Sequence, residues 1–99
     1  MILGMVVGNV VSTQKDAGLT GFKLLVVQQV GLDMQLKPSY LIAADAVGSG
    51  LNEVVIVVQG SSARIAEGSK NKPVDASVIA IVDTMEVEGR RVYQKFQNS

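Results

Sequence analysis

The chain has 99 residues, with nine Lys plus Arg and nine Asp plus Glu, so its formal net charge is zero. This balance excludes the strongly basic surface that nucleic acid or an anionic membrane usually requires. The sequence also lacks cysteine and histidine, which excludes disulfides, thiolate metal sites and the commonest general base. We therefore expect no metal and no cofactor.

A chain of this length predicts one domain, spanning residues 1–99. Hydrophobic residues make up 47% of it, a large share for a small domain with much surface per residue. Part of this apolar content is expected to face another subunit. The apolar start "MILGMVVGNVV" lacks a basic flank and is too short to span a bilayer. These features predict a cytoplasmic, self-associating protein that does not bind membranes.

Apolar, β-branched runs separated by turn residues predict an all-β fold. In chain order, the predicted strands comprise residues 1–11, 22–30, 40–47, 53–59 and 76–87. The fourth is almost continuously valine and isoleucine, which indicates a strand covered on both faces. Glu88 and Gly89 are expected to turn the chain back into a terminal hairpin arm.

A short helix is predicted between the fourth and fifth strands. Ser61 or Ser62 is a suitable N-cap, and Gly68 is a suitable C-cap. Five strands with this helix predict a small, partly open five-stranded barrel that is OB-like, of the oligonucleotide-binding type. The strand order is not determined by one sequence.

The stretch "QGSSAR" raises the question of a serine nucleophile or a phosphate site. A nucleophile needs a neighbouring base, and without histidine the available bases are Lys70 and Lys72, which lie in a polar loop. The stretch also lacks the second glycine of the G-x-S-x-G elbow, and the sequence lacks a P-loop motif. We therefore interpret Ser61 and Ser62 as helix-capping residues.

Three aspartates, Asp45, Asp75 and Asp83, lie in or beside apolar runs. A pair of carboxylates is able to perform acid–base chemistry. More often such an aspartate caps a turn or pairs with an arginine across an interface, and we favour that interpretation. We therefore expect a protein that is not an enzyme.

An alternative function for an OB-like barrel is binding of nucleic acid by aromatic residues in a basic groove. The aromatic residues are Phe22, Tyr40, Tyr93 and Phe96, and the only basic pair near one of them is Arg90–Arg91. We favour the absence of a nucleic-acid partner and retain a small nucleic-acid-binding module as the alternative.

Three stretches carry a resemblance to a known family: "GLTGFKLLVV" from Gly18, "AADAVGSGLNEVVIVVQGSSAR" from Ala43 and "PVDASVIAIVD" from Pro73. In order and spacing they resemble the vertex proteins of bacterial microcompartments, the EutN/CcmL-type family of shell pentamers. The likeness covers nearly the whole chain. Two positions depart from the family pattern: Ser49 stands where alanine is usual, and Asn52 stands where glycine often precedes the glutamate.

The resemblance implies a barrel that assembles into a cyclic homopentamer at the vertices of a polyhedral shell. Its further partners would be the hexameric microcompartment shell proteins that form the facets, and it would lie in the microcompartment shell in the cytoplasm. A flat hexagonal layer closes only with five-fold defects, and a ring of five identical heterologous contacts supplies one. The enzymes that such a shell encloses are not determined by this sequence.

On this interpretation the loop "DAVGSG" with Glu53 lies near the ring axis or at a subunit contact, because its glycines permit positive φ or close approach of chains. A Ser49→Leu variant that assembles normally would count against this placement. The terminal arm, with its aromatic and basic residues, is a further candidate for reaching a neighbour. Turn chemistry within one subunit explains all these residues equally well. The candidate pore or subunit-interface residues are Thr13, Asp45, Gly48, Ser49, Gly50, Glu53, Arg64 and Asp75.

Overall fold

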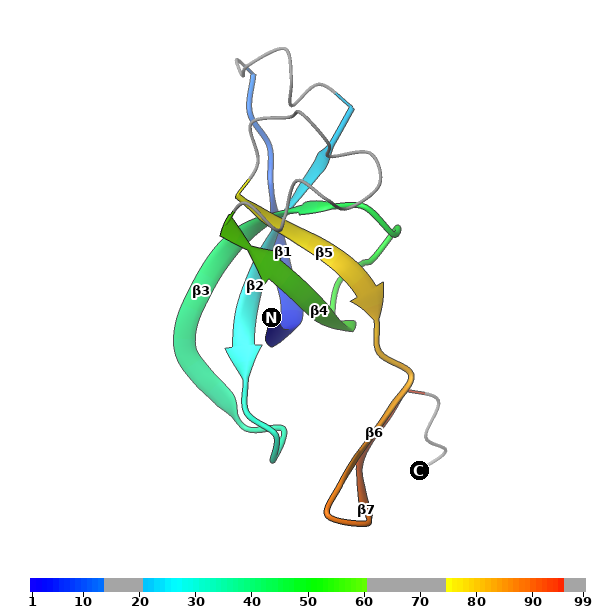
Figure 1. The fold of residues 1–99 in the computed structure, drawn as a ribbon. Helices are drawn as coiled ribbons and strands as arrows, with labels where there is room; N and C mark the ends of the chain where they lie inside the picture. The colour runs from blue at the N-terminus through cyan, green and yellow to red at the C-terminus, as the bar shows by residue number, and fades with distance from the viewer. Residues whose placement is uncertain (14–20, 61–74, 96–99) are drawn as a thin grey trace.

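A computed structural model of the chain describes residues 1–13, 21–60 and 75–95. Within them, five strands form a closed barrel in the order β1-β2-β3-β5-β4, and two further strands form a separate sheet (Figure 1). The strands are β1 (Ile2–Val10), β2 (Lys23–Val30), β3 (Leu36–Asp45), β4 (Val54–Gln59), β5 (Ala76–Ile81), β6 (Thr84–Val87) and β7 (Arg90–Gln94). The predicted all-β, five-stranded barrel is confirmed, although it is closed rather than partly open. The helix predicted over 61–68 lies outside the described residues.

The order of the strands around the barrel differs from their order along the chain. β4 lies between β1 and β5, and both of these pairings are antiparallel. The barrel closes where β3 and β5 run parallel, through the pairs Ala44↔Ser77 and Asp45↔Val78. This contact is short, so β5 borders only the last part of β3.

The core consists mainly of valine side chains that point into the barrel. Its buried members are Val6, Leu25, Val27, Ala43, Val55, Val57, Ala76 and Val78. In β4 the adjacent residues Val54 and Val55 are both fully buried, as are Val57 and, nearly, Val58. The prediction that this strand is covered on both faces is therefore confirmed.

The predicted start of the third strand at Tyr40 is wrong, because β3 begins at Leu36. This earlier half contains Pro38, which has no N–H for a ladder. Proline is compatible with a strand that has a neighbour on one side only. Here that neighbour is β2, which pairs Val30 with Leu36 and donates a hydrogen bond from Gln28 Nε2 to the Lys37 carbonyl oxygen at 3.0 Å.

The predicted continuous strand 76–87 is also wrong, because it divides into β5 and β6. The N–H of Val82 donates to the carbonyl oxygen of Val54 at 2.8 Å, and the chain then leaves the barrel. The predicted hairpin arm is confirmed. Glu88 and Gly89 have φ of 53° and 78°, the positive values that both central residues of a type I′ hairpin turn require.

Candidate functional site

The loop between β3 and β4, residues 46–53, contains four of the eight candidate residues: Gly48, Ser49, Gly50 and Glu53. A fifth, Asp45, directly precedes the loop. Asp45 ends β3, and its side chain is 4% exposed. Its Oδ1 accepts hydrogen bonds from the N–H of Val47 at 3.3 Å, the N–H of Ser49 at 3.1 Å and the hydroxyl of Ser49 at 2.8 Å. One carboxylate thus folds the first half of the loop back onto the strand that precedes it.

Lys23, from the start of β2, holds the same half of the loop from the other side. Its Nζ donates to the carbonyl oxygen of Ser49 at 2.6 Å and lies 3.8 Å from Asp45 Oδ2. Ser49 is fully buried, and its side-chain and backbone polar groups all have partners within the chain. The ammonium, carboxylate and hydroxyl groups form one closed network.

Glu53 organises the second half of the loop. Its Oε1 accepts from the N–H of Gly50 at 2.7 Å, and its own N–H donates to the Gly50 carbonyl oxygen at 3.1 Å. Its Oε2 forms an ion pair with Lys95 Nζ, directly after β7. Glu53 therefore connects the loop to the C-terminal hairpin.

The ion pair shifts the pKa of both partners. The hydrogen bond from Lys95, together with that from the Gly50 N–H, lowers the pKa of the Glu53 carboxyl below its ordinary 4.5. The hydrogen bond to Glu53 raises the pKa of Lys95 above its ordinary 10.5. Both groups are therefore charged throughout the neutral range.

The two departures from the family pattern have physical reasons in this loop. Asn52 has φ of 70°, a left-handed conformation that glycine adopts freely and asparagine tolerates. Its N–H donates to the carbonyl oxygen of Val6 at 2.8 Å, which anchors the turn on β1. Ser49 supplies a hydroxyl donor to Asp45, a hydrogen bond that alanine has no group to form.

The grouping of Ser49, Asp45 and Lys23 resembles a nucleophile with its activators but is arranged differently. The Ser49 hydroxyl is buried, and it donates to a carboxylate that already accepts two backbone N–H groups. Lys23 Nζ donates to the Ser49 backbone oxygen rather than to the side chain. An open hollow of about 220 Å³ beside the loop is lined mainly by aliphatic residues and glycines. These contacts stabilise the loop and leave the Ser49 hydroxyl inaccessible to a substrate.

The remaining candidates are not part of this network. Thr13 is exposed after β1, and Asp75 is exposed before β5, where its carbonyl oxygen accepts from the Gly60 N–H at 2.7 Å. Arg64 lies outside the described residues. Sequence reasoning missed Lys23 and Lys95, which stand 26 and 42 residues away from their hydrogen-bond partners. No local pattern identifies contacts at such separations.

Two further features bear on the class of site. Among residues 1–13, 21–60 and 75–95, no group of three or more His, Cys, Asp or Glu side chains is placed to hold a metal ion. The same residues form no helix long and apolar enough to cross a membrane.

Comparison with known proteins identifies the family. Residues 1–83 match the family model described as "Ethanolamine utilisation protein EutN/carboxysome". The carboxysome shell vertex protein CcmL of Gloeobacter violaceus is 46% identical over 95 residues, covering 96% of this chain and 95% of the relative. The solved structure of Gloeobacter violaceus CcmL superposes with a TM-score of 0.93 at 45% identity, covering 98% of this chain and all of that one.

A second solved structure, the pentameric microcompartment shell protein GrpN from Rhodospirillum rubrum, superposes with a TM-score of 0.78. It is 45% identical and covers 88% of this chain and 98% of its own. The family model and these relatives each match most of the chain. The chain belongs to the EutN/CcmL family of bacterial microcompartment shell vertex proteins.

Proposed function

We propose that this chain is a structural shell protein of a bacterial microcompartment, which forms a cyclic homopentamer and occupies the vertices of the shell in the cytoplasm. The observation that carries the proposal is the likeness to the Rhodospirillum rubrum protein, which is described as pentameric. Residues 1–99 act as one domain in this role, and the neighbouring shell components are hexameric proteins.

The physical role is geometric. A layer of hexagons curves into a closed shell only where five-fold units replace six-fold ones, and a ring of identical heterologous contacts provides such a unit. A rigid subunit suits this role, because the angle between neighbours must repeat five times. The hydrogen-bonded loop between β3 and β4 contributes to that rigidity.

We place this loop at the ring axis or at a subunit contact. Its polar groups are satisfied inward, by Asp45 and Glu53, whereas its apolar side chains Val47 and Leu51 are 41% and 64% exposed. Exposed apolar side chains on a rigid loop are typical of a surface that a neighbour covers. Because Ser49 is buried within its own subunit, Leu51→Glu tests the placement more directly than Ser49→Leu.

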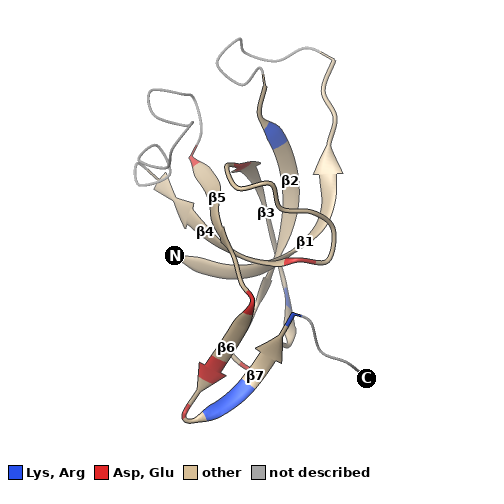
Figure 2. Cartoon of the chain, turned by 90° about the vertical axis from the view of Figure 1, so that its right-hand side faces the viewer, with Lys and Arg blue, Asp and Glu red and all other residues tan. Residues whose placement is uncertain are grey.

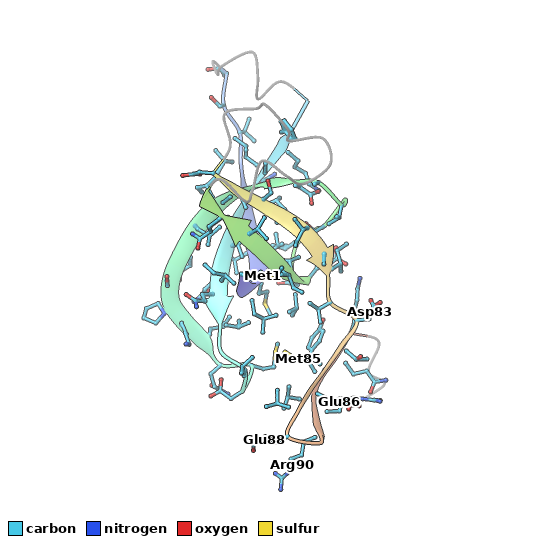
Figure 3. The ribbon with its side chains drawn as sticks, in the orientation of Figure 1. Met1, Asp83, Met85, Glu86, Glu88 and Arg90 are labelled. Atoms are coloured by element: carbon cyan, nitrogen blue, oxygen red, sulfur yellow. The ribbon has the colours of Figure 1, made fainter. Side chains whose placement is uncertain are left out.

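The proposed protein is not an enzyme and does not bind nucleic acid. In the described residues basic and acidic side chains are interspersed, and β6 carries the acidic residue Glu86 beside the two arginines of β7 (Figure 2, Figure 3). A nucleic-acid groove requires continuous positive charge with stacked aromatic residues. The alternative function as a nucleic-acid-binding module is therefore not favoured.

Native mass spectrometry of the purified chain tests the oligomer. The expected species has five times the 10.4 kDa mass of one chain. Co-expression with a hexameric shell protein, followed by electron microscopy, tests the vertex role: closed polyhedra are expected with this chain and open sheets or tubes without it. A monomer, or shells that close equally well without the chain, would contradict the proposal.

A further inference from the structure

We draw no further inference here: the strongest candidate, the open hollow of about 220 Å³ beside the loop between β3 and β4, is bordered by the Lys23 ammonium group, which already donates to the Ser49 carbonyl oxygen and pairs with Asp45, and nothing in the structure shows what covers it.

Discussion

Lys95 forms an ion pair with Glu53, although the two residues are 42 positions apart in the sequence. Glu53 also accepts a hydrogen bond from the Gly50 N–H, so the pair joins the C-terminal hairpin to the loop between β3 and β4. The loop and the hairpin are thereby connected through one carboxylate.

Glu53→Gln is expected to loosen the hairpin while the barrel stays folded. The amide oxygen still accepts from Gly50, but the attraction to Lys95 is lost. Hydrogen exchange of the β6 and β7 amides is expected to accelerate, with little change in the exchange of β1 and β4 amides. Glu88→Gln, at the exposed hairpin turn, is the control and should leave both sets unchanged. Equal acceleration throughout the barrel would show that Glu53 stabilises the whole fold instead.

The same ion pair predicts a pH window. The pKa of Glu53 is lowered in the folded chain, so its contribution to stability is present above its ordinary pKa of 4.5 and is lost as the pH falls through the folded value. The pKa of Lys95 is raised, so its contribution is present below 10.5 and is lost as the pH rises through the folded value.

Denaturant midpoints of the unaltered chain and of Glu53→Gln, compared across this range, check the window. The difference between them is expected to be constant at neutral pH and to vanish at acid pH, where the protonated carboxyl resembles the amide. A difference that persists in acid would mean that the ion pair is not its origin.

Asp45→Ala is expected to destabilise the chain by about 1–3 kcal/mol, because it leaves buried donors of Ser49 and the Val47 N–H without their acceptor. Ser49→Ala removes one donor and keeps the backbone bonds to the carboxylate, so about 1 kcal/mol is expected. Guanidinium denaturation at matched protein concentration measures both. If Ser49→Ala lowered the free energy of unfolding as much as Asp45→Ala, the prediction that the carboxylate contributes more than the hydroxyl would be contradicted.

Gly4→Ala is expected to destabilise the barrel by about 1–3 kcal/mol, the usual cost of overpacking a core. A Cβ at Gly4 would collide with Val27 Cγ1, and Val27 is fully buried. Gly8→Ala, in the same strand, is the matched control, since its Cβ would lie 3.8 Å from Val26, an ordinary contact. Thermal denaturation should distinguish the two, and equal melting temperatures would show that β1 shifts to accept the methyl group.

Much of the local structure follows from residue patterns. The valine runs specify the strands, and Glu88-Gly89 specifies a hairpin turn, because each signal lies within a few consecutive residues. The two wrong strand boundaries occur where local preference and tertiary structure diverge. Pro38 is incompatible with a central strand, but the structure places it in a half of β3 that pairs on one side only. The apolar residues of β5 and β6 predict a single strand, but the chain leaves the barrel between them.

The candidate loop was predictable in its residues but not in its contacts. The sequence by itself determined an all-β chain of a shell vertex family, with Asp45, Ser49 and Glu53 in one glycine-containing loop. Only the tertiary structure decided that Lys23 and Lys95 hold that loop, that β3 and β5 close the barrel, and that the hairpin stands apart. The physical reason is that strand and turn preferences arise from neighbouring residues, whereas ion pairs and barrel closure join residues that the folded chain alone brings together.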